Sequence, residues 1–146
     1  MMGIKKDSFG FLVADVSRLL RNAFQNRLGA GGLTFLQARA LVYISRHEGV
    51  RQNQLAELIE IQPITLVNII DQLEARRLVK RTMDPRDRRA KQLFLTPTAQ
   101  PVLETIETVI DSIRMDAMIG LDYEEALQAI SALQRIRANL SADALA

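Results

Sequence analysis

The chain has 146 residues, of which 48% are hydrophobic and 25% are charged, and its formal net charge is +2. These values are ordinary for a globular protein, and the length predicts a single domain over residues 1–146 with a buried core. The absence of cysteine excludes disulfides, thiol nucleophiles and cysteine-bound zinc, and the short apolar runs exclude a membrane span.

Apolar residues recur at spacings of three and four residues from residue 8 to residue 28, which predicts one amphipathic helix. Four small residues, GAGG at 29–32, break this pattern and predict a linker. Thr34 is suited to cap a second helix that runs to about Arg46. We expect the inner face of this helix to consist of Leu36, Ala40, Leu41 and Ile44.

Two short helices are predicted next, over residues 52–59 and 63–76. Pro63 suits the first turn of the second helix, where its missing N–H would have no partner. The first helix is expected to bury Leu55, Leu58 and Ile59. The second is expected to bury Leu66, Ile70 and Leu73, and to turn outward Thr65, Asn68, Ile69 and Gln72. Two short helices with a polar outer face on the second are typical of a helix-turn-helix.

Residues 78–82 and 91–95 are short, partly alternating and β-prone, so they predict a β-hairpin with a basic tip. Positive charge is concentrated here. Residues 76–91 contain eight basic and two acidic residues, a net charge of +6, whereas the rest of the chain has a net charge of −4. This asymmetry favours a surface that binds a polyanion. The alternative is a solvated loop with internal ion pairs.

The C-terminal part is predicted to form two long helices. Thr96 is expected to cap the first, with Pro97 at its first position, and Gly120 is expected to end it. Asp122 followed by Glu125 predicts a capping box for the last helix. The apolar stripe of that helix consists of Leu127, Ile130, Leu133, Ile136 and Leu140.

The predicted fold is therefore mainly α with a small β-hairpin. It has a winged helix-turn-helix core over residues 32–96 and long dimerisation helices over residues 8–28 and 97–141. The terminal helices carry more apolar surface than one small domain covers, which predicts a homodimer joined through both termini. The residues expected in that interface are Phe9, Leu12, Val16, Ile113, Ile130, Leu133 and Leu140.

Residues 54–99 read QLAELIEIQPITLVNIIDQLEARRLVKRTMDPRDRRAKQLFLTPTA. This stretch closely resembles the core of MarR-type transcriptional regulators, and within them it looks most like the SlyA branch. The matching motifs are Leu55-Ala56, Asp71-Gln72-Leu73-Glu74, Leu78-Val79, and Asp87-Arg88-Arg89-Ala90-Lys91 followed by Leu95-Thr96. Together with a weaker match at the second helix they cover about residues 32–105, and the flanks are similar only in helical layout.

The resemblance implies an obligate homodimer that binds a pseudo-palindromic site in double-stranded DNA. The recognition helices would enter adjacent major grooves, the wings would reach the minor grooves, and a crevice would bind a small aromatic or phenolic acid as effector. The chain departs from the family pattern at four positions. Arg77 and Gln100 replace glycines, Arg51 replaces a Ser/Thr helix cap, and Asn68 replaces an arginine that reads a base in the SlyA branch.

Six residues of the second short helix are candidates for DNA contact: Pro63, Ile64, Thr65, Asn68, Ile69 and Gln72. The carboxamides of Asn68 and Gln72 match the N6 and N7 edge of adenine, and Thr65 suits a thymine methyl group or a phosphate. Ile64 and Ile69 are expected to touch thymine methyl groups or to pack on the neighbouring helix, with packing preferred for Ile69. The alternative is an ordinary polar helix surface.

Six basic residues of the hairpin are further candidates: Lys80, Arg81, Arg86, Arg88, Arg89 and Lys91. Arginine is favoured in narrow A·T minor grooves, so the three arginines from Arg86 to Arg89 are expected there. Lys80 and Arg81 are expected to meet phosphates. Asp87 is expected to pair with a neighbouring arginine and to hold the loop in shape.

The predicted function is a homodimeric, sequence-specific regulator of transcription. We expect it to act as a repressor that a small anionic or phenolic ligand releases from DNA. Two alternatives stay open: an activator of the SlyA type that displaces a silencing protein, and a winged helix used for protein–protein contact. The sequence has no nucleophile–base constellation, phosphate loop or metal-ligand cluster, so we expect no enzymatic activity, cofactor or metal. No signal peptide is predicted, and we expect a cytoplasmic, nucleoid-associated protein.

Overall fold

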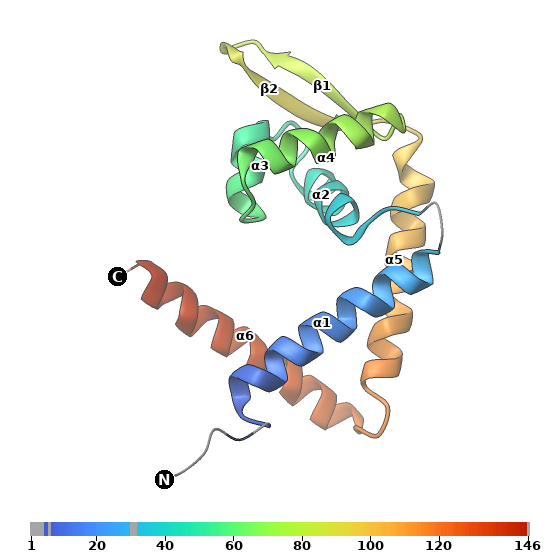
Figure 1. Cartoon of the computed structure of the whole chain (residues 1–146), viewed down its shortest axis with the longest axis vertical. Coiled ribbons are helices and arrows are strands. Elements are labelled where there is room, and N and C mark those ends of the chain that lie inside the picture. The colour runs from blue at the N-terminus through green and yellow to red at the C-terminus, as the bar shows by residue number, and fades with distance from the viewer. Residues whose placement is uncertain (1–4, 6, 30–31, 146) are drawn as a thin grey trace. The chain divides into compact units, whose positions relative to one another are not determined.

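The computed structural model describes residue 5, residues 7–29 and residues 32–145, with side chains as far as residue 141. Six helices and two strands follow one another along this part of the chain (Figure 1). The predicted fold class, mainly α with one β-hairpin, is confirmed. The elements are α1 (Phe9–Leu28), α2 (Phe35–Arg46), α3 (Gln52–Leu58), α4 (Pro63–Ala75), β1 (Val79–Asp84), β2 (Asp87–Leu95), α5 (Ala99–Ala117) and α6 (Tyr123–Leu145).

The chain forms two compact units, Met1–Asp111 and Ser112–Ala146, and the boundary between them falls within α5. The first unit contains α1 to α4 and the hairpin. The predicted GAGG linker lies only partly in the described residues, because residues 30 and 31 are outside them. Among the helices described, none is both long enough and apolar enough to cross a membrane.

α2 begins with a capping box. Thr34 Oγ1 accepts a hydrogen bond from Gln37 N at 3.2 Å, and Gln37 Oε1 accepts one from Thr34 N at 3.0 Å. The predicted cap at Thr34 is therefore confirmed. The inner face begins with Gln37, which is buried, whereas the prediction that Leu36 faces inward was wrong because Leu36 is 37% exposed. The other predicted inner residues are fully buried: Ala40, Leu41 and Ile44.

α3 and α4 form the predicted helix-turn-helix. A tight turn joins them, with Glu60 at a φ of 54° and with Ile61 N donating to Ala56 O at 3.1 Å. The prediction that Leu58 is buried was wrong, since it is 46% exposed. The other predicted core residues of these helices are fully buried: Leu55, Ile59, Leu66, Ile70 and Leu73.

α4 ends in a left-handed residue that is not glycine. Arg77 has a φ of 60°, in the region where a side chain costs about 1 kcal/mol relative to glycine. Arg77 N donates to Glu74 O at 2.9 Å, and Leu78 N donates to Leu73 O at 3.0 Å. These are the two hydrogen bonds of a Schellman motif. The chain thus keeps a helix end that suits glycine and places an arginine in it.

β1 and β2 pair in antiparallel register from Val79↔Leu95 to Met83↔Lys91, and then Asp84 pairs with Asp87. Residues 88–90 of β2 are consequently left without partners and form a bulge. The hairpin is longer than predicted, and its tip contains only Pro85 and Arg86. Arg88 and Arg89, predicted in a loop, lie in this bulged part of β2.

A short extended segment before α3 joins the hairpin to the helices. Gly49 N donates to Leu93 O and Leu93 N donates to Val50 O, each at 2.9 Å. Arg51 forms an isolated bridge with Gln92. The side of β2 next to α3 is therefore hydrogen-bonded to the chain that leads into the helix-turn-helix.

The helix after the hairpin begins later than predicted. Its first residue is Ala99, and Pro97 lies in a turn that precedes it. Thr96 does not act as the side-chain cap; its Oγ1 donates to the carbonyl oxygen of Arg77. This hydrogen bond connects the end of β2 to the end of α4.

α6 begins with the predicted capping box. Glu125 N donates to Asp122 Oδ1 at 2.8 Å, and Asp122 N donates to Glu125 Oε1 at 3.2 Å. Gly120, which was predicted to end the preceding helix, follows the last turn of α5 with a φ of 89°. The capping box is therefore confirmed, whereas α5 ends at Ala117, and Gly120 lies in the turn between the two long helices.

Candidate nucleic-acid interface

The outer face of α4 is a polar surface with one large apolar residue. Thr65 is half-buried, and Ile64 is 69% exposed. Ile69 is only 6% exposed, so the prediction that it faces outward was wrong and the alternative of packing is confirmed. The exposed candidates on this face are Pro63, Ile64, Asn68 and Gln72.

The carboxamide of Gln72 has a partner inside the protein. Gln37 Nε2 donates a hydrogen bond to Gln72 Oε1 at 2.6 Å. Gln37 lies 35 positions earlier, at the start of α2, and is 6% exposed. Gln72 is thus exposed, as predicted, and Gln37 in addition holds its carboxamide. No local pattern in the sequence connects these two residues.

Basic side chains cover the outer surface of the hairpin. The exposed ones are Lys80, Arg86, Arg88, Arg89 and Lys91. Within the described part of the chain, Lys80, Arg88, Arg89 and Lys91 form no ion pair. Their positive charge is therefore available to an anion outside the chain. Asp87 contacts a backbone rather than an arginine side chain, since its Oδ1 accepts from Arg89 N at 3.0 Å.

Asp84 is a carboxylate that sequence reasoning missed. It is 4% exposed, it lies 2.7 Å from Arg51 Nε through Oδ2, and its Oδ1 accepts a hydrogen bond from Arg86 N at 2.9 Å. The hydrogen bond from Arg86 N and the guanidinium of Arg51 hold the pKa of Asp84 below its usual range, although burial acts in the opposite direction. The unusual Arg51 before α3 was the available signal.

Arg81 has a different role from the predicted one. Its guanidinium lies 2.6 Å from Asp71 and 3.3 Å from Glu74, and it donates to Gln52 Oε1 at 2.9 Å. The Arg81 side chain is only 18% exposed. Because acceptors on α3 and α4 already surround it, the expected contact with DNA phosphate does not fit this geometry. Arg81 instead joins β1 to both helices.

A polar groove of about 260 Å³ separates the start of α3 from the bulged part of β2. Cationic and amide side chains line most of it, with Asp87 as the one acidic residue in the lining. The lining residues are Arg51, Gln52, Asn53, Asp87, Arg89, Ala90 and Lys91. This composition suits a phosphate oxygen or another small anion.

Comparison with known proteins agrees with this geometry. The sequence model of the MarR family matches residues 31–90. The crystal structure of transcriptional regulator PA3341 is 36% identical, with 92% of this chain and 98% of that chain covered and a TM-score of 0.78. The chain belongs to the MarR family.

Two further structures are similar to this MarR-family chain. A MarR-family transcriptional regulator from Rhodococcus sp. RHA1 is 28% identical, with 92% of this chain and 96% of that chain covered and a TM-score of 0.82. BpsR from Bordetella bronchiseptica, whose DNA binding is regulated by 6-hydroxynicotinic acid, is 21% identical, with coverages of 94% and 98% and a TM-score of 0.82. The second similarity concerns the fold alone.

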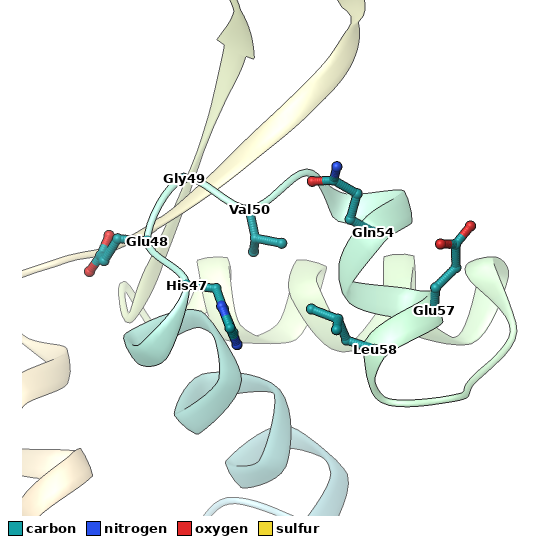
Figure 2. Close-up of a pocket in the computed structure, with 7 residues that line it drawn as sticks. All are labelled: His47, Glu48, Gly49, Val50, Gln54, Glu57 and Leu58. Atoms are coloured by element: carbon teal, nitrogen blue, oxygen red, sulfur yellow. The ribbon is translucent and has the colours of Figure 1, made fainter. Parts of the chain in front are cut away.

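The pocket in Figure 2 lies between the turn after α2 and the outer face of α3, with a volume of about 650 Å³. It contains His47, the only histidine of this MarR-family chain. Glu48 points away from the side chains of α3 in this view (Figure 2), and Glu48 Oε2 accepts a hydrogen bond from Leu95 N at 3.3 Å. No group of three potential metal ligands occurs among the residues described.

A smaller cavity of about 240 Å³ lies between α1, α2 and the first half of α5. Its walls are mainly apolar, with two arginines beside an aromatic ring. The guanidinium carbons of Arg39 and Arg46 lie 5.7 and 6.0 Å from the centre of the Tyr43 ring. An apolar cavity with cationic groups at its wall suits a small aromatic anion.

Proposed function

We propose that this MarR-family protein binds double-stranded DNA as a homodimer and thereby regulates transcription. The observation that carries the proposal is the polar outer face of α4 beside a hairpin on which four exposed basic side chains, those of Lys80, Arg88, Arg89 and Lys91, form no ion pair over the described residues. In this arrangement α4 enters the major groove, and the hairpin meets phosphates and the minor groove. The 36% identity to transcriptional regulator PA3341 supports the role in regulation.

The proposed contacts differ from the sequence-based set. Recognition rests on Pro63, Ile64, Thr65, Asn68 and Gln72, without Ile69. The wing contacts rest on Lys80, Arg86, Arg88, Arg89 and Lys91, without Arg81. Asp84 and Asp87 hold the hairpin in shape and do not face the DNA.

We propose a homodimer because α1 and α6 each expose a row of apolar side chains. α1 exposes Phe9, Leu12 and Val16, at 58%, 45% and 52%. α6 exposes Ile130, Leu133 and Leu140, at 39%, 56% and 61%. Rows of exposed apolar side chains on a helix are typical of a surface that another protein covers. Ile113 is 8% exposed, so little of it remains for a partner, and we leave it out of the proposed interface.

We further propose that a small aromatic or phenolic acid releases the protein from DNA, so that it acts as a repressor. The apolar cavity beside Arg39, Tyr43 and Arg46 supports this effector class. The wing motif Asp87-Arg88-Arg89-Ala90-Lys91 favours the SlyA branch, whose activators displace a silencing protein, and this stays the second candidate. A cytoplasmic, nucleoid-associated location follows from the proposed function.

Duplex binding tests the proposal. Fluorescence anisotropy with randomised and selected duplexes should give an affinity that falls steeply with salt, by about 0.9 log units per released phosphate contact for each log unit of salt. The variant Arg135→Ala, which removes an exposed arginine outside the candidate interface, should bind like the wild type. Binding that does not depend on salt would favour the winged helix used for protein–protein contact.

Addition of 6-hydroxynicotinate or a hydroxybenzoate to the complex tests the effector. We expect release of the duplex, and we expect Arg39→Gln to raise the ligand concentration that half-release requires. A complex that persists at every ligand concentration, with wild type and variant alike, would contradict regulation by this class of ligand.

A further inference from the structure

Gln37 is a buried polar residue that connects the start of α2 to the outer face of α4. It is 6% exposed and forms hydrogen bonds at both ends of its carboxamide. Its Oε1 accepts from Thr34 N at 3.0 Å, and its Nε2 donates to Gln72 Oε1 at 2.6 Å. α2 and α4 are thereby joined through side-chain amides as well as through apolar packing.

The backbone of Thr34 determines which way the Gln37 amide points. Thr34 N–H is a donor, so only the oxygen of the Gln37 amide can meet it. The nitrogen of Gln37 must then lie at the opposite end, next to Gln72. A nitrogen at that place can only donate, so the atom of Gln72 that meets it must be its oxygen. The capping box of α2 therefore determines the orientation of an amide on α4.

Gln72 is exposed on α4, and its amide oxygen is the atom directed at Gln37. Its NH2 group forms no hydrogen bond within the described residues. The group left for an outside partner is consequently a donor. Bidentate contact with adenine also needs the oxygen as an acceptor, and here the oxygen is directed at Gln37, which occupies one of its two lone pairs.

We infer that Gln37 is a positioning residue that fixes the amide polarity of Gln72, so that Gln72 presents donors to a guanine edge in the major groove. Guanine offers two acceptors there, N7 and O6, whereas cytosine offers only the N4 amino donor. The inference rests on the proposed function, because it assumes that α4 faces DNA. It replaces the expected adenine contact of Gln72 with a guanine contact.

The variant Gln37→Glu separates this role from a structural one. A carboxylate at this position still accepts from Thr34 N, as glutamate does in a capping box. Its second oxygen can only accept at pH 8, so the Gln72 amide must turn over and present its oxygen outward. We expect the preferred base to change from guanine to cytosine or adenine, with the urea midpoint of the variant close to that of the wild type.

Selection from randomised duplexes at pH 8 gives the base preference of the wild type, Gln37→Glu, Gln72→Ala and the double variant. We expect a guanine preference of about fivefold or more in the wild type, its reversal in Gln37→Glu, and its loss in both proteins that carry Gln72→Ala. A guanine preference that survives in Gln37→Glu or in Gln72→Ala would overturn the inference.

A measurement without DNA separates this inference from the proposed function. In NMR spectra of the wild type, the side-chain NH2 of Gln37 should exchange slowly with water and that of Gln72 should exchange fast. The opposite order would overturn the inference even if the protein binds DNA. Failure of the wild type to bind any duplex would overturn the proposed function and, with it, the guanine contact.

Discussion

Arg51 and Asp84 are 33 positions apart in the sequence, yet Arg51 Nε lies 2.7 Å from Asp84 Oδ2. Arg51 directly precedes α3, and Asp84 is the last residue of β1. The ion pair therefore holds the hairpin against the helix-turn-helix. Because Asp84 also accepts from Arg86 N at the tip, the same carboxylate fixes where the tip begins.

Asp84→Asn should lower both the urea midpoint of unfolding and the affinity for duplex DNA. The asparagine oxygen still accepts from Arg86 N, but the charge that meets Arg51 is lost. Arg51→Lys, which keeps the charge and loses the planar guanidinium, should give a smaller effect on both quantities. Chemical denaturation and fluorescence anisotropy on the same samples check this prediction.

The pH dependence of the Asp84 contribution follows from the direction of its pKa shift. The pKa is lowered in the folded protein, so the contribution is fully present above the unfolded-state pKa and is lost as the pH falls through the folded-state pKa. The difference in free energy of unfolding between wild type and Asp84→Asn should thus be constant near neutral pH and shrink below about pH 4. If the difference in free energy of unfolding instead shrinks above pH 5, it does not arise from the ionised Asp84 carboxylate.

Arg77→Gly should stabilise the protein by about 1 kcal/mol, because glycine takes the left-handed conformation at the end of α4 without steric cost. Arg77→Ala is the matched control: it removes the same side-chain charge but keeps a Cβ in the left-handed residue. Urea denaturation should place Arg77→Ala near the wild type and Arg77→Gly above both. Equal midpoints for the two variants would mean that the backbone strain is absent.

Arg89→Ala should mainly weaken DNA binding, whereas Arg81→Ala should mainly lower the stability of the fold. Arg89 is exposed and forms no ion pair within the described residues, so its loss should weaken DNA binding and reduce the salt slope by about one, with little change in stability. Arg81 contacts Asp71, Glu74 and Gln52, so its loss should cost about 2 kcal/mol of stability. Anisotropy at several salt concentrations and urea denaturation separate the two effects.

Local hydrogen-bond patterns explain which parts of the fold could be predicted. The caps at Thr34 and Asp122 follow from residues three positions apart, and the buried stripe of α4 follows from helical periodicity. The partners in the pairs Gln37–Gln72 and Arg51–Asp84 could not be identified from the sequence, because they meet only after the helices and the hairpin pack; the unusual Arg51 before α3 marked one position but not its partner. The role of Arg81 was missed for the same reason: composition reveals its charge but not the acceptors that surround it.

Leu133→Glu should convert a dimer into a monomer. Leu133 is 56% exposed in the single chain and belongs to the proposed interface, where a carboxylate without a partner would lose its hydration. Glu124→Gln, on the same helix and exposed, is the control for a change of charge outside the apolar stripe. Sedimentation equilibrium at micromolar concentration should give a dimer mass for the wild type and the control, and a monomer mass for Leu133→Glu. If the wild type is itself a monomer, the terminal helices do not form the proposed interface. Nothing would then hold together the two recognition helices that a pseudo-palindromic site needs.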